Sequence, residues 1–131
     1  MAKKDVSKPP EKEKVEELFA ALCRQPILRF PKERELLIAP TEAGVYVIRQ
    51  DNLVLHVGRT LRGKNGLHQR LKNHLRGSSS FTDKYLKGKG ALLRDGRHTY
   101  QSLVVKNPRL RALLEAYAIG TLCPKHIGLG E

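Results

Sequence analysis

The chain has 131 residues, 40% of them hydrophobic and 5% aromatic, so it has room for one domain with one modest core. No apolar run reaches the roughly 18 to 20 residues that would span a membrane, and the N-terminal segment lacks the apolar core of a secretory signal. With a formal net charge of +12, the composition therefore predicts a basic cytoplasmic protein, located at the nucleoid or in the nucleus if it is associated with DNA.

The positive charge is concentrated in the middle of the chain. Residues 56–98 hold 11 Lys and Arg against only Asp83 and Asp95, a net charge of +9. A focused basic region favours a polyanionic partner, and phosphate groups are the commonest polyanion. Nucleic acid is the favoured partner, and a basic surface that is merely solvated is the open alternative.

The sequence of the first 40 residues predicts a tail, a helix and a segment that connects the helix to the main domain. Residues 1–11 are rich in Lys, Pro and Glu, so we expect a disordered basic tail. Apolar residues recur at helical spacing over residues 11–24, which predicts an amphipathic helix. We therefore divide the chain into the tail at 1–11, an N-terminal helix and connecting segment at 12–40, and a main domain at 41–131. Residues 36–38 are expected to form a short extended piece.

The main domain begins with a predicted β-hairpin. Residues 44–49 and 53–60 are rich in β-formers and are separated by a short polar turn. A glycine-containing loop then leads into a helix at 67–76. Residues 78–90 are predicted to form a mobile basic connection.

The remainder predicts one more strand and one more helix. Residues 100–105 have the composition of a strand, and Asn107 followed by Pro108 predicts a helix start. This helix should end near Cys123, before Pro124. The predicted fold class is thus α/β, with a small, mainly antiparallel three-stranded sheet flanked by helices and an extra N-terminal helix.

The two cysteines, Cys23 and Cys123, lie in apolar helical contexts. Without the spacing of a zinc or redox motif, they are expected to be buried free thiols.

The helix at 67–76 carries two candidate site residues. Leucines form its buried stripe, and Arg70 and His74 lie four residues apart on one flank of that stripe. Lys72 and Arg76 point roughly the other way. Because a guanidinium can hold two phosphate oxygens and keeps its charge, Arg70 suits a phosphate site. Ordinary boundary positions of an amphipathic helix are the alternative.

Glu115 is the only acidic residue in the last predicted helix, which is apolar around nearly its whole circumference. A buried carboxylate must be paired, protonated or bound to a cation. An ion pair with Arg111, one turn earlier, is one interpretation. The other is a metal ligand, since one carboxylate with water and substrate oxygens suits Mg²⁺.

Tyr46 and His56 lie on the two neighbouring strands of the predicted hairpin. Both fit a core role. A tyrosine hydroxyl or an imidazole aimed at a phosphate could also orient or deprotonate an attacking water.

Taken in order, Gly44-Val45-Tyr46, His56-Val57-Gly58-Arg59-Thr60, Arg70-Leu71-x-x-His74 and Leu114-Glu115-Ala116 resemble the motifs of the GIY-YIG nuclease superfamily. The resemblance covers roughly residues 42–124. It implies that Tyr46 activates or positions water, that Arg70 stabilises the transition state, and that Glu115 binds a single divalent metal. His74 matches a position that is a histidine near the nucleophile in some restriction enzymes.

The chain departs from the family pattern in three places. His56 stands where the second motif normally opens with tyrosine, which keeps a proton acceptor but changes its reach and pKa range. The loop between Gly58 and Arg70 is longer than usual. The asparagine that often follows the last helix is absent, and His126 is only a loose substitute.

These observations predict an endonuclease that hydrolyses phosphodiester bonds in duplex or branched DNA with one Mg²⁺ or Mn²⁺. Tyr46, His56, Arg70 and His74 are the candidate catalytic residues, and Glu115 is the candidate metal ligand. Basic residues are expected to contact the DNA backbone, with affinity that falls steeply with salt: Arg59, Arg62, Lys64, Lys72, Arg76, Lys84, Lys87 and Lys89. Sequence specificity would come from a homodimer or a recognition partner, or would be slight.

Two other functions stay open. A non-catalytic nucleic-acid-binding module on a degenerate fold of this kind is favoured by His56 and by the missing asparagine. A scaffold or ribosome-associated basic protein requires only the charge.

Overall fold

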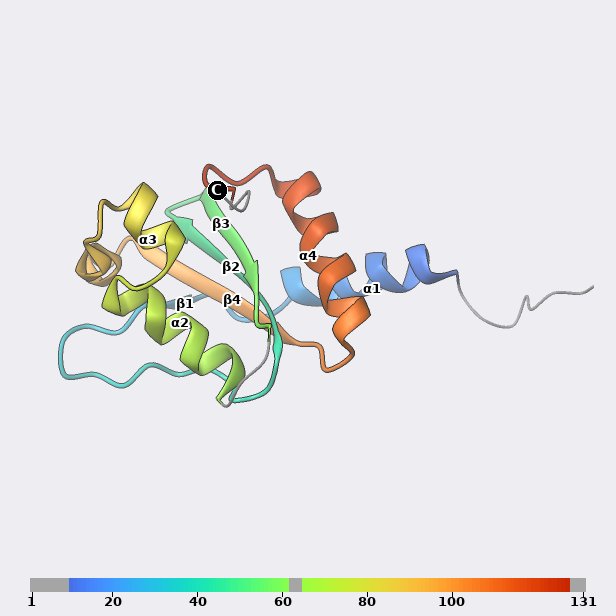
Figure 1. Ribbon diagram of the computed structural model, residues 1–131, viewed down its shortest axis with the longest axis horizontal. Coiled ribbons are helices and arrows are strands. Elements are labelled where there is room, and N and C mark those ends of the chain that lie inside the picture. Colours follow the sequence, from blue (N-terminus) through green and yellow to red (C-terminus); the bar gives the residue numbers. More distant parts are fainter. Residues whose placement is uncertain (1–9, 62–64, 128–131) are drawn as a thin grey trace, which may run out of the picture.

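A four-stranded antiparallel sheet organises the fold of the computed structural model, which describes residues 10–61 and 65–127 (Figure 1). Its strands are β1 (Leu28–Arg29), β2 (Gly44–Gln50), β3 (Leu53–Arg59) and β4 (His98–Val104). The order across the sheet is β1-β4-β2-β3, so β3 is an edge strand. All three strand pairs are antiparallel.

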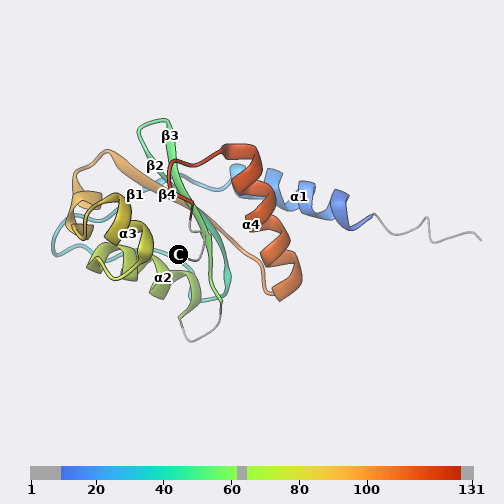
Figure 2. The ribbon, with the colours of Figure 1, turned by 45° about the horizontal axis from the view of Figure 1, so that its top comes forward.

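Helices cover both faces of this sheet (Figures 1 and 2). One face packs against α1 (Glu11–Cys23) and α4 (Pro108–Leu122), and we call it the α4 face. The other packs against α2 (Gly66–Arg76), α3 (Ser80–Tyr85) and the 3₁₀-helix η1 (Gly90–Arg94), and we call it the α2 face.

Strand alternation assigns each side chain of β2 to one of these faces. Val45 and Val47 enter an apolar cluster on the α4 face with Leu114 of α4. Tyr46 and Ile48 enter the cluster on the α2 face. The core is therefore two layers separated by the sheet.

The predicted hairpin and long helices are confirmed to within two residues at each end, and the α/β class with its N-terminal helix is confirmed as well. Asn107 caps α4 as expected, because its Oδ1 accepts a hydrogen bond from the Leu110 amide at 3.0 Å. The division at 1–11, 12–40 and 41–131 stays a prediction.

The sheet has one more strand than the three predicted. The extended piece lies at β1, where Leu28 pairs with Tyr100, and not at residues 36–38. Leu36 is 88% exposed and Ile38 72% exposed, so their hydrophobicity was a misleading strand signal. A two-residue strand is too short to produce an alternation pattern.

The segment predicted to be a mobile basic connection instead folds into α3 and η1. Phe81 of α3 and Leu93 of η1 are buried in the cluster on the α2 face. Both helices are shorter than two turns, so neither shows helical periodicity in the sequence.

The prediction of buried cysteines was wrong. Cys23 ends α1 and Cys123 follows the last residue of α4, and both are exposed. Helix α4 is also less buried than its composition suggested, with Arg111, Leu114 and Ala118 as its buried residues. No helix in the described ranges combines the length and the apolar character needed to cross a membrane.

Candidate active site

The edge strand β3 allows both faces of the sheet to contribute to one site. Gly58 is opposite Tyr46 in the β2–β3 register, on the α2 face. The next residue, Arg59, points to the other face, where it meets Glu115 of α4. Since β3 is the edge strand of the sheet in the described part of the chain, α2 and α4 approach the same edge from opposite sides.

A pocket of about 430 Å³ lies at this edge. The polar and charged residues among its lining come from β3, α2, α3 and α4: His56, Arg59, Thr60, Gln69, Arg70, Asn73, Ser80 and Glu115.

The Tyr46 hydroxyl is the point where three predicted site residues meet. It accepts a hydrogen bond from Arg70 Nε at 3.2 Å and lies 2.7 Å from Nε2 of His74. Tyr46 and His74 are both fully buried. Burial raises the pKa of Tyr46 to about 12, although the Arg70 charge opposes the shift, so the phenol is neutral at physiological pH.

Gly58 provides the space for this phenol. A Cβ at position 58 would lie 2.3 Å from the Tyr46 hydroxyl oxygen, far inside van der Waals contact. Gly58 also lines the pocket, so the hydroxyl lies directly behind the pocket wall. The glycine of the second motif is thus required by a close side-chain approach and not by a turn.

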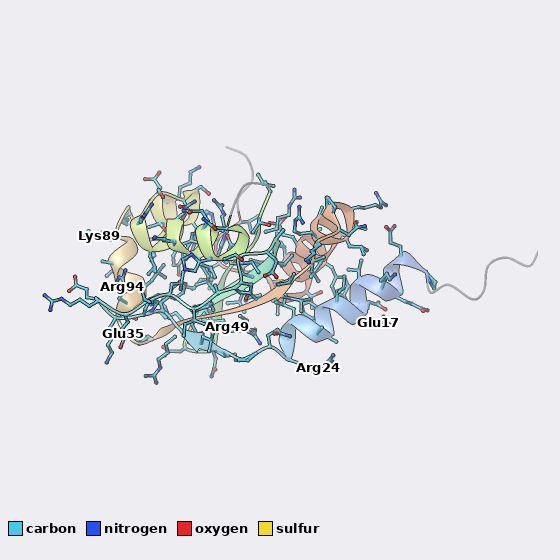
Figure 3. All side chains as sticks on the ribbon, turned by 90° about the horizontal axis from the view of Figure 1, so that it is seen from below. Glu17, Arg24, Glu35, Arg49, Lys89 and Arg94 are labelled. Carbon is cyan, nitrogen blue, oxygen red and sulfur yellow. The ribbon has the colours of Figure 1, made fainter. Side chains whose placement is uncertain are left out.

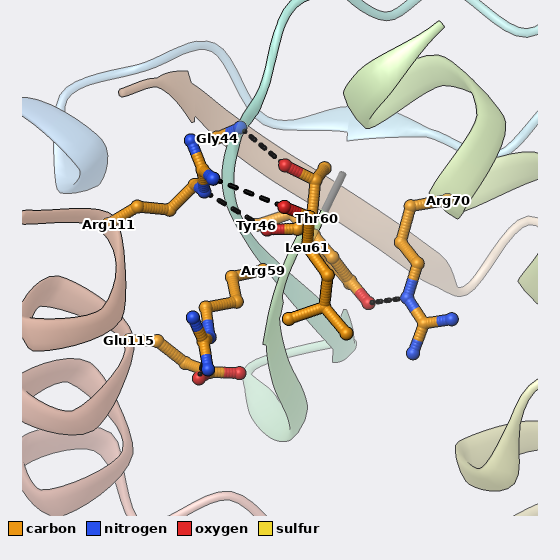
Figure 4. A network of polar contacts seen from close by, with 8 residues as sticks. All are labelled: Gly44, Tyr46, Arg59, Thr60, Leu61, Arg70, Arg111 and Glu115. Atoms are coloured by element: carbon orange, nitrogen blue, oxygen red, sulfur yellow. Dashed lines mark hydrogen bonds and ion pairs between the residues drawn. The ribbon is translucent and has the colours of Figure 1, made fainter. Parts of the chain in front are cut away.

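Arg70 connects this buried hydroxyl to the pocket. Its Nε–H donates to Tyr46, and Figure 4 shows its two terminal nitrogens directed away from the tyrosine. Within the described residues these nitrogens have no hydrogen-bond partner in the structure, and Arg70 lines the pocket. They are available to an anion.

Glu115 lines the opposite wall. Its Oε1 accepts a hydrogen bond from Arg59 Nε at 2.9 Å (Figure 4). The two side chains are 24% and 32% exposed, so water reaches the pair. Partial burial raises the pKa of Glu115, and the Arg59 charge opposes the rise.

The alternative ion pair between Glu115 and Arg111 does not form. Arg111 is buried and donates to backbone carbonyls instead, with Nε 3.0 Å from the Thr60 oxygen and Nη2 3.3 Å from the Leu61 oxygen (Figure 4). Its Nη1 donates to the Val105 carbonyl at 3.0 Å. Arg111 thereby fixes the end of β3 and the start of the next loop.

His56 lines the pocket but makes no hydrogen bond to the other candidate catalytic residues in the described part of the chain. Its ring stacks on Phe81, with centroids 4.8 Å apart and planes 13° apart. Both ring nitrogens are buried and have no hydrogen-bond partner in the described part of the chain. Burial lowers the pKa of His56 to about 3, and the charges of His126 and Arg70 add to the shift, so the ring is neutral.

The C-terminal segment covers the free edge of β3. The amides of Lys125 and His126 donate to the carbonyls of Val54 and Leu55 at 3.1 and 2.8 Å. This places the centroid of the His126 ring 5.2 Å from that of the His56 ring.

The remaining basic candidates lie outside the pocket. Lys72 is half-buried on α2, and four others are exposed at the end of α2 or beyond it: Arg76, Lys84, Lys87 and Lys89. Lys89 lies at the opposite end of the molecule from α4 (Figure 3). Arg62 and Lys64 lie outside the described residues. Of the predicted basic residues that the structure describes, Arg59 and Arg70 line the pocket.

The donors in the pocket fit a single hard divalent cation. Mg²⁺ commonly binds one or two carboxylates and completes its shell with water and phosphate oxygens. Glu115 is the carboxylate in the pocket lining, and no group of three or more His, Cys, Asp or Glu within the described ranges could hold a metal ion. Glu115 thus supplies a carboxylate of the kind that could take part in such a shell.

Two residues absent from the sequence prediction complete the site behind His74. Ser79 Oγ lies 2.6 Å from Nδ1 of His74, and Thr82 Oγ1 lies 2.9 Å from Ser79 Oγ. A helix-capping pattern was the available sequence signal for these residues, since a serine can cap a helix by accepting the amide three residues later. In the structure Ser79 is the N-cap of α3, and its Oγ accepts a hydrogen bond from the Thr82 amide at 3.1 Å.

No protein-family model and no curated protein matches this sequence. Among solved structures, the chain is similar to the GIY-YIG N-terminal endonuclease domain of UvrC from Thermotoga maritima bound to its catalytic magnesium. That match is 26% identical, covers 67% of this chain and 85% of that chain, and has a TM-score of 0.50. A point mutant of the same domain is 22% identical, covers 86% of this chain and 93% of that chain, and has a TM-score of 0.49. The chain has the fold of the GIY-YIG nuclease superfamily.

Proposed function

We propose that this protein is a DNA endonuclease that uses one Mg²⁺ or Mn²⁺. The observation that carries the proposal is the contact set around the Tyr46 hydroxyl, with Arg70 and His74 bonded to it and Glu115 on the facing wall of the same pocket. The similar UvrC domain is described as an endonuclease bound to a catalytic magnesium, which supports the same class of activity here.

Arg70 binds the scissile phosphate. Its terminal nitrogens can donate two hydrogen bonds to phosphate oxygens while Nε stays on Tyr46. The same guanidinium therefore stabilises the negative charge that develops on the phosphate and holds the phenol in place. Arg59 adds a second positive charge at the pocket wall.

Tyr46 and His74 move the proton of the attacking water. As water attacks phosphorus, its proton passes to the Tyr46 oxygen while the phenol proton passes to Nε2 of His74. Tyr46 need not exist as free phenolate, which its pKa of about 12 disfavours at neutral pH. Burial lowers the pKa of His74, so the ring is neutral and has a lone pair to receive the proton, and the negative charge of a bound phosphate would offset the cost of forming the buried cation.

Glu115 would hold the divalent cation, which supplies Lewis-acid stabilisation of the phosphate and leaving oxygen when bound. Burial raises the pKa of Glu115, and the contact with Arg59 opposes that rise and favours the charged carboxylate that a metal ion needs.

Basic residues on and beyond α2 hold the DNA backbone, and the described candidates are the half-buried Lys72 and the exposed Arg76, Lys84, Lys87 and Lys89. Such contacts make affinity fall steeply with salt but carry little sequence information. Specificity for a DNA sequence or branch structure would come from a homodimer or from a recognition partner.

The test is cleavage of supercoiled, linear and branched DNA in Mg²⁺ or Mn²⁺. We expect the wild type to nick at least one substrate, and Arg70→Ala and Glu115→Ala each to lose about 10²- to 10³-fold or more in rate. Glu17→Ala within α1 and Arg24→Ala just after it change exposed residues away from the site and serve as charge-matched controls (Figure 3).

Binding of DNA without cleavage on any substrate would overturn the proposal. It would favour the alternative of a non-catalytic nucleic-acid-binding module, for which the buried, unbonded nitrogens of His56 are the specific support.

A further inference from the structure

Behind the Tyr46 hydroxyl, four polar side chains form a buried chain of hydrogen bonds. The chain runs from Tyr46 to His74, Ser79 and Thr82, and all four residues are at least nine-tenths buried. Buried polar groups without water must satisfy one another, so the proton positions in such a chain are restricted.

The donor direction can be assigned from the far end. Thr82 has one hydroxyl proton, and Oγ1 donates it to the His74 carbonyl at 3.0 Å. The 2.9 Å contact between Thr82 and Ser79 therefore uses the Ser79 proton, with Thr82 as acceptor. Ser79 then has no proton left for its 2.6 Å contact with His74.

The same reasoning fixes the proton on the imidazole. Since Ser79 Oγ can only accept, Nδ1 of His74 must donate to it, and a neutral ring then carries a lone pair on Nε2. The Tyr46 oxygen already accepts the Arg70 Nε–H, so its own proton is free to point to Nε2 at 2.7 Å. Every proton in the chain has one consistent position.

We infer that Ser79 and Thr82 are positioning residues that lock His74 in its Nδ1–H tautomer, which makes Nε2 a permanent acceptor for the Tyr46 proton. The tautomer itself is a property of the structure. Its effect on the reaction rate rests on the proposed nuclease function. Ser79 and Thr82 lose no proton in the reaction. They exclude the Nε2–H tautomer, in which two donors would face each other between His74 and Tyr46 or the phenol would have to turn its proton away.

The geometry of the turn explains why this arrangement is rigid. Ser79 is the N-cap of α3, and its oxygen is also held by the Thr82 amide. Gly90 packs so closely beneath the turn that a Cβ there would lie 2.5 Å from the His74 carbonyl oxygen. Backbone contacts thus hold both Ser79 Oγ and the His74 carbonyl, the two ends between which the side-chain hydrogen bonds run.

The test reads the tautomer directly from the ¹⁵N chemical shifts of His74 in the DNA-free protein. We expect Nδ1–H in the wild type, a substantial Nε2–H population in Ser79→Ala, and recovery of Nδ1–H in Ser79→Thr, which retains both hydroxyl and cap. Thr82→Val retains the Ser79 cap and removes only the terminal acceptor, so it should also allow the second tautomer.

The kinetic counterpart is a loss in kcat with little change in KM. Ser79→Ala should lower kcat by about 10- to 100-fold, within the range of general acid–base effects, and change KM by less than about threefold. Ser79→Thr should restore the rate. A pure capping role would change thermal stability and leave both the tautomer and kcat at wild-type values.

The inference is overturned if His74 keeps the same tautomer in Ser79→Ala and Thr82→Val, or if the wild type carries the proton on Nε2. Because the ¹⁵N measurement needs no DNA and no metal, it separates this outcome from failure of the proposed function. If the wild type never cleaves DNA but the variants change the His74 tautomer as expected, the inference about Ser79 and Thr82 stands and only the proposed function fails.

Discussion

The two faces of the sheet differ in what they bury. On the α4 face, the clustered core residues are aliphatic, with Val45, Val47 and Leu114 among them. On the α2 face, the cluster surrounds the polar chain of Tyr46 and His74. The α4 face thus pairs its aliphatic cluster with buried Gln101 and Arg111, which donate to backbone carbonyls, whereas the α2 face buries a chain of side chains bonded to one another. Stability and chemistry are separated by strand parity, since adjacent residues of β2 serve the two purposes.

The largest contrast should come from removing the Tyr46 hydroxyl on the α2 face. Tyr46→Phe keeps the ring in its packed position but removes the group bonded to Arg70 and His74. We expect the cleavage rate to fall about 10²- to 10⁴-fold, the usual range for loss of a positioned proton-transfer group. Steady-state kinetics check the rate, and retained DNA affinity in a binding assay would show that the loss is chemical. A rate within about threefold of the wild type would contradict the proposed proton path.

The matching change on the α4 face is Leu114→Ala. Leu114 is fully buried among aliphatic neighbours and does not line the pocket. The cavity left behind should lower the free energy of unfolding by about 2 to 5 kcal/mol. Urea denaturation measures this loss, and the cleavage rate well below the melting temperature should stay within about twofold of the wild type. A large rate loss in the folded protein would mean that the faces are coupled.

The length of each element decided which site residues the sequence could predict. Tyr46, Arg70, His74 and Glu115 could be singled out because they lie on long, regular elements and match, in order, the motifs that the chain resembles. Ser79 and Thr82 were missed because α3 has six residues and shows no period. The Arg59–Glu115 pair joins residues 56 positions apart, and local spacing favoured Arg111 instead. Long-range pairing depends on the strand order, which no local pattern encodes.

The third prediction concerns the close approach between Gly58 and Tyr46. In Gly58→Ala, the new methyl group would overlap the phenol oxygen, so the ring must shift away from Arg70 and His74. We expect a rate loss of about 10- to 100-fold and a destabilisation of about 1 to 3 kcal/mol from overpacking. Gly120→Ala is the control, because a Cβ there meets nothing within 4 Å in the last turn of α4. It should be neutral or stabilise by up to about 1 kcal/mol.

The pH dependence of stability should also come from the α2 face. The pKa of His56 is lowered to about 3 and that of His74 well below its usual value, so the unfolded chain binds more protons than the native state below about pH 6.5. Stability should be insensitive to these groups above that pH and should fall as the pH decreases, by at most about 1.4 kcal/mol per pH unit for each histidine.

Denaturation in urea between pH 7 and pH 4 measures this slope. His56→Phe, which can keep the stacking on Phe81, should reduce the slope, whereas Leu114→Ala should lower stability by the same amount at every pH. An unchanged slope in His56→Phe would mean that His56 is protonated in the native state.

The smallest expected effect concerns Arg59, through which the α4 face contributes a cation to the pocket wall. Its contact with Glu115 places a positive charge on the carboxylate that would bind the divalent cation. Removing that charge in Arg59→Gln should strengthen Mn²⁺ binding by about two- to tenfold, because a cation no longer competes for the same oxygen. Calorimetric titration of Mn²⁺ without DNA measures this directly. Arg97→Gln removes an arginine from an exposed pair with Asp51, remote from the pocket, and should leave Mn²⁺ affinity unchanged. If Arg59→Gln binds Mn²⁺ no better than Arg97→Gln, the carboxylate of Glu115 is not the group that takes the metal, and the α4 face would serve stability alone.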